Sequence, residues 1–539
     1  MSLNWDREFA FLEVFSKDIQ EGPPLPAADP DALARHAAGV MRLQDLLSLI
    51  TTLPADKRPS IPRWDDLLGP LWREFFIKGD DIDRYVLGDL WRRVLRESGE
   101  TERFLRSSAA VASSARNCCR PQEALSCCLE GRKASDGEDS AALVNLLNTE
   151  GTVYVVLRDF ESAEATFRQA LAIAERLPEN APLLHARISK VDLVAQEYMN
   201  IQGTQLQRGL EGPDSERTRW AERAEETIRA VSRMPLSGET RRMLDIDRAT
   251  LALLRGEVEE AGVQLTGYLA DPAVEKGPYR YSLKPMICRL LSLTAVIQED
   301  WRSAYIWIRT ALQEGVNHNF PVEDHLVLEQ VIRILRGLHD IQDLKAQDTL
   351  VEDLSQLLVD KDWYTGGSHS RGVSRLSERI ARILIADNQW AIDLQTMRKA
   401  GLLHDIGKLR IPWSLLNKIA PISPRERSIL QDHSIHGGDI LRQMGLDGLA
   451  AVVEQHHESL DGSGYPTGKP PSPMAAILAV CDVYEALTTP NRKYKDPKPR
   501  AAALAEICSE SGTRFHPDVV NALVLIHERD AVIPETDGS

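Results

Sequence analysis

Histidines and aspartates gather in the last third of the chain. Six of the 13 histidines lie between positions 369 and 457, and they are His369, His404, His433, His436, His456 and His457. Asp405 directly follows His404, and Asp482 comes later. Imidazole and carboxylate groups together suit iron, manganese or another divalent first-row metal ion. Burying several imidazoles without partners would cost on the order of 1–3 kcal/mol each, whereas metal ions would satisfy them together. These residues therefore predict a metal centre.

Apolar residues surround two of these histidines at helical spacing. His369 shares a helix face with Val373 and Ile380, and His433 shares one with Ile440. A single histidine on such a face is more often a core residue than a ligand. Several of them, with an adjacent His-Asp pair, indicate that helices bring ligands from separate segments to one buried site.

A lysine accompanies the His-Asp pair. Lys408 lies four residues after His404, and side chains at i and i+4 share a helix face. We therefore expect Lys408 to project toward the metal centre, where its charge could bind a phosphate or position a water. The alternative is a solvated surface lysine.

Five segments carry a resemblance to a known family. They are GLLHDIGKLRIP at 401–412, the His-x-x-x-Gly of His433 and Gly437, HHESLDGSGYP at 456–466, AVCDVYEALT at 479–488, and the later RKYK. Over roughly residues 350 to 525 the chain resembles the HD-GYP family of phosphohydrolases. The resemblance implies a bacterial phosphodiesterase for cyclic di-GMP, with a metal centre inside a helical bundle.

The resemblance also implies two sets of metal ligands that share one carboxylate. One ion is expected on His369, His404, Asp405 and Asp482. The other is expected on Asp405, His433, His456 and His457. Two divalent ions, iron or manganese, would lower the pKa of a shared water and generate hydroxide near neutral pH. That hydroxide would attack the phosphorus in line with the departing 3′ oxygen.

Substrate contacts are expected around this centre. Lys408 would bind phosphate, and Arg492 and Lys495 could pair with the second phosphate. The turn from Asp461 to Pro466 contains Gly464 and Tyr465, and the tyrosine could contact or stack on a guanine. A purely structural role for this turn, beside the metals, is an equal alternative.

Several positions depart from the family pattern near the expected nucleotide. The segment between Asp461 and Asp482 is shorter than usual, Ala476 replaces an arginine, and an extra residue precedes Arg492. These changes leave two alternatives to cyclic di-GMP hydrolysis. One is another cyclic dinucleotide such as cyclic GMP-AMP, and the other is a non-catalytic nucleotide-binding or scaffold protein. Thr365 stands where trinuclear family members carry a metal-binding Glu, which predicts a binuclear centre.

Helical periodicity extends along nearly the whole chain, so the predicted fold class is all-α. We expect an N-terminal helical region at 1–104, with Trp64, Trp72 and Trp91 as core anchors. This region is followed by helical repeats at 105–320, a helical connector at 321–349 and the phosphohydrolase domain at 350–530.

Each expected repeat has three anchor residues at positions i, i+4 and i+7. The first is small, the second is usually large, and the third is small or medium in size. The anchors are Ala124, Cys128, Gly131; Ala163, Phe167, Ala170; Ala224, Ile228, Val231; Ala261, Leu265, Tyr268; and Ala304, Ile308, Ala311. The second unit, with Gly151 and Tyr154, resembles a tetratricopeptide repeat (TPR). This implies a concave surface for an unidentified protein partner or a second copy of the chain. The alternative is a helical scaffold without a ligand.

Composition narrows the remaining possibilities. The chain has 64 Lys and Arg against 80 Asp and Glu, a net charge of −16. This disfavours a DNA- or RNA-coating role but leaves room for a local basic pocket that takes a small anion. No membrane span or signal peptide is expected. Seven cysteines fit a reduced cytoplasm. The pairs Cys118-Cys119 and Cys127-Cys128 suit helix contacts better than zinc.

Overall fold

The computed structural model divides the chain into two compact units, Met1–Val331 and Ile332–Ser539. The structure describes residues 81–137, 139–178, 189–236, 238–276, 280–316, 361–362, 366–388, 390–416, 422–489 and 497–532, together with isolated positions in 12–71 and 330–359. These residues form helices and no named strand, apart from an isolated bridge between Ser511 and Phe515. The all-α prediction is confirmed for this part of the chain.

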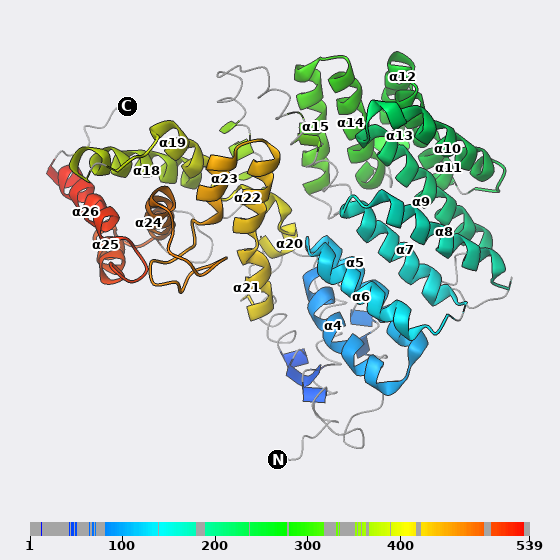
Figure 1. Ribbon diagram of the computed structural model, residues 1–539, viewed down its shortest axis with the longest axis horizontal. Coiled ribbons are helices and arrows are strands. Elements are labelled where there is room, and N and C mark those ends of the chain that lie inside the picture. Colours follow the sequence, from blue (N-terminus) through cyan, green and yellow to red (C-terminus); the bar gives the residue numbers. More distant parts are fainter. Residues whose placement is uncertain are drawn as a thin grey trace. The chain divides into compact units, whose positions relative to one another are not determined.

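The first unit consists of consecutive helices that pack against their neighbours in the sequence (Figure 1). They are α4 (Asp81–Ser98), α5 (Thr101–Asn117), α6 (Pro121–Ala134), α7 (Ala141–Val156), α8 (Phe160–Arg176), α9 (Lys190–Glu211), α10 (Asp214–Ser232), α11 (Gly238–Leu254), α12 (Val258–Leu269), α13 (Pro272–Glu275), α14 (Arg280–Ile297) and α15 (Trp301–Val316). The boundary expected at residue 104 lies inside this unit, because α4 packs against α5.

Small residues in the first unit let its helices approach closely. A Cβ at Gly151 of α7 would lie 2.5 Å from the Phe167 ring of α8, so only glycine leaves room for that ring. Phe167 and its neighbours Ala163 and Ala170 are buried. Every other predicted anchor is also buried except Tyr268, which is partly buried. The predicted spacing therefore marks the contact faces of these helices.

Tryptophans form part of the core at the start of this unit. Trp64 and Trp91 are each 1% exposed, and their ring centroids lie 6.2 Å apart. Trp72 lies outside the described residues. Cys118, Cys127 and Cys128 are buried among the helices, and none of the three forms a disulfide with a described residue.

The second unit is a helical bundle around a long helix. Its elements are α18 (Gly366–Asn388), α19 (Leu394–Leu403), the 3₁₀ helix η2 (Ile406–Arg410), α20 (Trp413–Leu416), α21 (Pro424–Gln431), α22 (His433–Gln443), α23 (Asp447–Glu454), α24 (Pro473–Thr488), α25 (Arg500–Ser509) and α26 (Pro517–Val532). Helix α18 packs against α19, α24 and α26.

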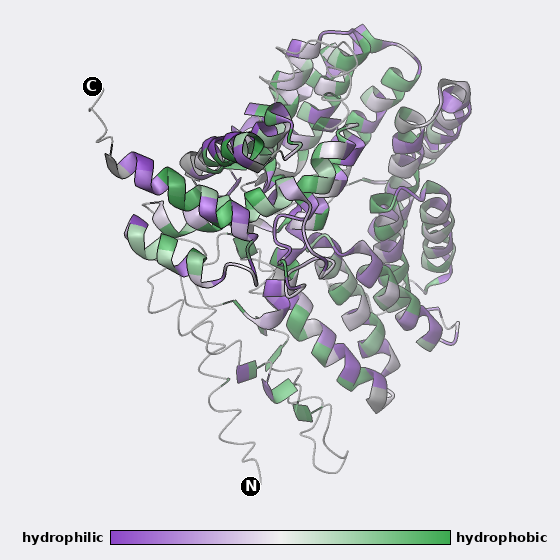
Figure 2. Cartoon of the chain, turned by 60° about the vertical axis from the view of Figure 1, so that its left-hand side comes forward, coloured by the Kyte–Doolittle hydropathy of each residue, from purple (hydrophilic) through white to green (hydrophobic). Residues whose placement is uncertain are grey.

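Hydrophobic and hydrophilic residues alternate around the helices of both units (Figure 2). In α18, Val373 and Ile380 are fully buried, as their spacing with His369 predicts. Among the helices that the structure describes, none has the length and the apolar character needed to cross a lipid bilayer.

Candidate metal centre

Short connections after helices supply most of the candidate ligands. His404 follows the last residue of α19, Asp405 precedes η2, and His456 and His457 follow α23 by two or three positions. His433 begins α22. Helix α18 contributes His369 and α24 contributes Asp482. Segments far apart in the sequence therefore bring all seven predicted ligands into one unit.

Two groups of ligand atoms form within this set. Ligand atoms of His369, His404 and Asp405 lie within 4.8 Å of one another, and so do those of His433, His456 and His457. Asp482 joins the first group, because its Oδ1 lies 3.1 Å from His369 Nε2 and 3.6 Å from His404 Nε2.

Asp405 lies between the two groups. Its Oδ2 is 3.3 Å from His404 Nε2, and its Oδ1 is 3.4 Å from His433 Nε2. Asp405 is only 4% exposed, so its carboxylate is held away from bulk water. One side chain therefore presents an oxygen to each cluster, which is the geometry a bridging ligand requires.

Three of the imidazoles hydrogen-bond to the ends of the helices that precede them. The Nδ1 atoms of His404, His433 and His456 lie 2.9, 2.6 and 2.5 Å from the carbonyl oxygens of Gly401, Leu430 and Val453. Each carbonyl belongs to the last turn of a helix, where carbonyls lack intrahelical partners. A carbonyl can only accept, so Nδ1 carries the proton and Nε2 is left as the ligand atom.

Burial and neighbouring charges shift the pKa values in opposite directions. Burial lowers the pKa of His457 to about 3 and that of His456 well below its usual range. Burial also acts to lower the pKa of His404, but Asp405 and Asp482 outweigh it and raise the pKa to about 10. Although burial opposes ionisation of both aspartates, Lys408 and His404 hold the pKa of Asp405 well below the usual range, and hydrogen bonds with His369 and His404 do the same for Asp482.

The donor atoms fit a divalent metal ion. His404 Nε2 is buried and makes no hydrogen bond of acceptable geometry, although two carboxylates lie near it. A buried polar atom without a hydrogen bond costs about 1–3 kcal/mol, and a cation would remove that cost. Imidazole nitrogens with anionic carboxylates suit iron, manganese and related ions.

Lys408 lies beside this centre, by a different geometry from the one expected. The segment after Asp405 is a 3₁₀ helix, so the expectation of an α-helical turn from His404 to Lys408 is wrong. In a 3₁₀ helix residues i and i+3 eclipse, and Lys408 Nζ lies 2.8 Å from Asp405 Oδ2. It also donates to Asp362 Oδ2 at 3.0 Å. Burial opposes protonation of Lys408, but the two carboxylates outweigh it and raise its pKa.

The loop after His457 is held by a residue that the sequence reasoning missed. The Glu458 carboxylate is buried and accepts hydrogen bonds from the backbone N–H and hydroxyl of Thr467 and from the N–H of Gly468. The sequence feature that could have revealed this role is the position of Glu458 directly after His456 and His457 in the HHE motif. Asp461, in the same loop, accepts from Ser463 and is exposed to solvent.

The other expected substrate residues of the loop have distinct surroundings. A Cβ at Gly464 would overlap the backbone of His457 and Ser459. The Tyr465 ring lies 4.8 Å from the His457 ring, between centroids, and burial raises the pKa of Tyr465. Arg492 and Lys495 lie outside the described residues.

Comparisons with known proteins match these observations. Residues 352–519 match the HD domain family. The cyclic di-GMP phosphodiesterase of Thermotoga maritima is 35% identical over 275 residues, which cover 48% of this chain and 68% of that protein. The chain belongs to the HD-GYP family. HD-GYP proteins contain an HD domain, HD domains are metal-dependent, and both ligand clusters lie within the matched residues.

Further HD-GYP relatives match shorter stretches. The 3′3′-cGAMP-specific phosphodiesterase 2 of Vibrio cholerae is 32% identical over 165 residues, 29% of this chain and 31% of that protein. The cyclic di-GMP phosphodiesterase response regulator RpfG of Xanthomonas campestris is 31% identical over 209 residues, 37% of this chain and 52% of that protein. The chain therefore spans about half or less of these two relatives.

Proposed function

We propose that this chain is a metal-dependent phosphodiesterase that hydrolyses cyclic di-GMP to linear pGpG, and further to GMP. The observation that carries the proposal is the position of Asp405, which directs one oxygen to His404 and the other to His433. A shared carboxylate between two histidine clusters is suited to two adjacent cations, and such pairs are used to cleave phosphodiesters.

The proposed centre holds two divalent ions, iron or manganese. His369, His404, Asp405 and Asp482 would hold one of them, and Asp405, His433, His456 and His457 the other. When bound, the ions supply Lewis acidity, which lowers the pKa of water and offsets negative charge on phosphate oxygens. The Nδ1 hydrogen bonds of three histidines keep their Nε2 atoms directed at this centre.

The chain's own side chains would orient the substrate. Lys408 is positively charged and 16% exposed, so its ammonium could reach a phosphate oxygen from beside Asp405. Tyr465 stacks beside His457 and offers an aromatic surface to a base. Arg492 and Lys495 are proposed partners of the second phosphate. Asp461 and Gly464 would shape the turn that carries Tyr465, since Asp461 bonds within the turn.

The helices of the first unit are proposed to receive a signal. Stacked helix pairs resembling TPR repeats commonly present a binding surface, so an unidentified protein partner or a second copy of this chain would bind there and alter catalysis. We place the protein in the cytoplasm, where cyclic dinucleotides act as signals.

Cyclic GMP-AMP is a second candidate substrate. A relative from Vibrio cholerae, 32% identical over 165 residues, is a 3′3′-cGAMP-specific phosphodiesterase. The sequence also departs from the family pattern near the expected nucleotide, as at Ala476, where the pattern has an arginine. Hydrolysis of the two dinucleotides in parallel separates these candidates.

The decisive experiment measures metal content and hydrolysis in one series. Wild-type protein loaded with manganese or ferrous iron should hydrolyse cyclic di-GMP, whereas Asp405→Asn should lose most of its metal and all activity. Asp439→Asn, on the surface of α22, is the matched control. Wild-type metal content in Asp405→Asn would contradict the bridging role, and an inactive metal-loaded wild type would favour a non-catalytic binding module.

A further inference from the structure

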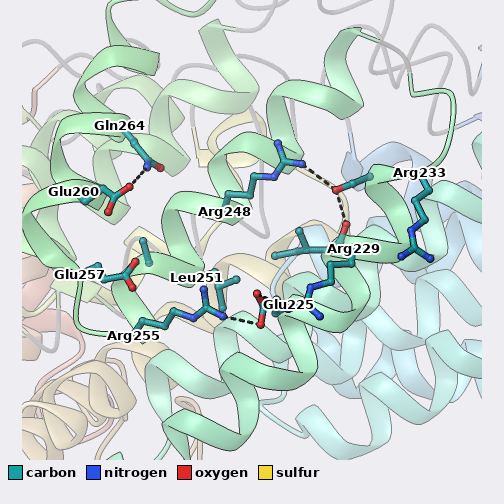
Figure 3. Close-up of a pocket in the computed structure, with 12 residues that line it drawn as sticks. Glu225, Arg229, Arg233, Arg248, Leu251, Arg255, Glu257, Glu260 and Gln264 are labelled. Atoms are coloured by element: carbon teal, nitrogen blue, oxygen red, sulfur yellow. Dashed lines mark hydrogen bonds and ion pairs between the residues drawn. The ribbon is translucent and has the colours of Figure 1, made fainter.

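A pocket of about 440 Å³ lies in the first unit, where α10, α11 and α12 meet (Figure 3). Small-molecule sites typically occupy about 300–1,000 Å³. The floor is apolar, because Ile228, Leu251 and Ala252 are nearly buried at 5%, 6% and 7% exposure. The walls carry four arginines and three glutamates, so charged groups surround a surface against which a flat ring could pack.

The charges are not spread evenly around the pocket. Arg229, Arg233 and Arg248 lie toward one end, whereas Glu257 and Glu260 lie toward the other (Figure 3). Arg255 lies on the Glu257 side, but its guanidinium is paired with Glu225, so the charges without such a pair are cationic at one end and anionic at the other.

Ion pairs fix the middle of the pocket. Glu225 accepts from Arg229 at 2.9 Å and from Arg255 at 2.7 Å, and these hydrogen bonds lower its pKa. Arg248 pairs with Asp245 and donates to the hydroxyl of Ser232 at 2.9 Å. These arginines are therefore held in place by partners before any ligand arrives.

Two charged groups at the ends are left for a ligand. Arg233 follows the last residue of α10, and its guanidinium has no hydrogen bond or ion pair with any residue that the structure describes. Glu257 precedes α12, yet its carboxylate does not cap that helix and likewise has no described partner. A complementary ligand carries an anion at one end and N–H donors at the other.

We propose that this pocket binds a guanine nucleoside monophosphate, with its phosphate at Arg233 and Arg248 and its base over the apolar floor. Guanine presents its N1–H and N2 amino donors side by side, which matches the two oxygens of the Glu257 carboxylate. Adenine lacks that donor pair. The chain has a net charge of −16, but a small anion contacts only the arginines of the pocket and can bind despite the overall negative charge. The site is separate from the metal centre, and only the source of the nucleotide rests on the proposed function.

Calorimetric titration of the full chain in excess EDTA tests the proposal without catalysis. GMP should bind at one site per chain, more tightly than AMP or inorganic phosphate. Arg233→Ala should lower the affinity for GMP by about tenfold or more, because a charge-assisted hydrogen bond to the phosphate is lost. Glu257→Gln should lower the affinity for GMP by a similar factor, so that the variant no longer prefers GMP over AMP. Its affinity for inorganic phosphate should not change. Arg241→Ala, exposed on α11 and outside the pocket, should match wild type.

Three results would overturn the assignment. The first is equal affinity of wild-type protein for GMP and AMP. The second is an Arg233→Ala variant that binds GMP as well as Arg241→Ala does. The third is loss of GMP binding in His404→Ala but not in Arg233→Ala, which would place the nucleotide at the metal centre. Because no step requires turnover, failure of the proposed phosphodiesterase activity would leave this measurement interpretable.

Discussion

Lys408 Nζ lies 3.0 Å from Asp362 Oδ2, so a carboxylate from the segment before α18 holds the lysine that follows the His-Asp pair. Lys408 has a second carboxylate, Asp405, at 2.8 Å. The lysine therefore links the segment before α18 to the candidate bridging ligand. Its removal has consequences for both stability and chemistry.

Replacing Lys408 by Met should reduce turnover by about tenfold to a hundredfold, because a charge-assisted contact to phosphate contributes about 1.5–3 kcal/mol. The free energy of unfolding should also fall, by about 3 kcal/mol, since breaking a buried ion pair leaves an uncompensated charge. Metal content should persist. Mass spectrometry of bound metal, steady-state kinetics and urea unfolding measure the three quantities. Lys469→Met, at an exposed position, is the control.

A double-mutant cycle separates the two effects. Combining Lys408→Met with Asp362→Asn should restore part of the stability, because the neutral amide no longer needs the cation. Turnover should stay low in the double variant. Equal turnover in wild type and Lys408→Met would place the lysine outside the reaction.

Gly407 is expected to be intolerant of any side chain. A Cβ there would overlap the backbone oxygen of His433 and the backbone nitrogen of Gly437. Gly407→Ala must therefore push η2 away from α22 and separate Asp405 from His433, with loss of metal and a much lower melting temperature. Gly448→Ala is the matched control: it lies in α23 with nothing within 4 Å of its Cβ. It should leave metal content and melting temperature close to those of wild type.

Stability of the first unit should depend on pH through Glu197. This carboxyl is fully buried, its Oε1 has no hydrogen bond, and burial raises its pKa from 4.5 to about 8. The folded state therefore retains a proton that the unfolded state releases. The resulting stabilisation is complete below about pH 4.5 and is lost as the pH rises to about 8.

Glu197→Gln should remove the contribution of Glu197 to this dependence, whereas Asp247, whose pKa burial raises to about 7, keeps its own. The variant should be more stable than wild type at pH 8, by on the order of 4 kcal/mol, and within about 1 kcal/mol of it at pH 5. Urea unfolding at both pH values measures the difference. Glu259→Gln, exposed on α12, should show the wild-type dependence. A Glu197→Gln variant with the wild-type slope would show that Glu197 is ionised in the folded state.

Two metal ions per chain are expected rather than three. Thr365, where a third-metal carboxylate would stand, lies outside the described residues, so this stays a prediction from the sequence. A linear product has a mobile, more highly charged end that two ions hold less well. pGpG should therefore accumulate before GMP in a chromatographic time course. Three ions per chain by metal analysis, or GMP without a pGpG intermediate, would contradict the expectation.

Local sequence signals predicted the part of the fold that depends on local rules. Ala163, Phe167 and Ala170 are buried because a small-large-small spacing marks a helix contact whatever the neighbouring helix is. Histidine and aspartate within short motifs predicted which candidate ligands would gather; most of them lie at or just after helix ends, whereas Asp482 lies inside α24.

Tertiary contacts could not be predicted in the same way. Asp362 and Lys408 are 46 positions apart, and no periodic pattern joins them. The 3₁₀ turn after Asp405 was missed because helical spacing alone does not distinguish it from an α-helix. Arg233 and Glu257 lie on what the sequence presents as ordinary solvated helix ends, and only the packing of three helices makes them the ends of one pocket.

The hydrogen bonds from His404, His433 and His456 to helix-end carbonyls have an evolutionary consequence. Many metal sites fix their imidazoles with a separate side chain, which must then be kept along with the ligand. Here backbone carbonyls fix the orientation of these three imidazoles, so no additional side chain is needed for that purpose. Loops around the centre are free to diverge and to accept new substrates while the geometry of these ligands is retained. Ligand rings held in this way are compatible with relatives named for different cyclic dinucleotides.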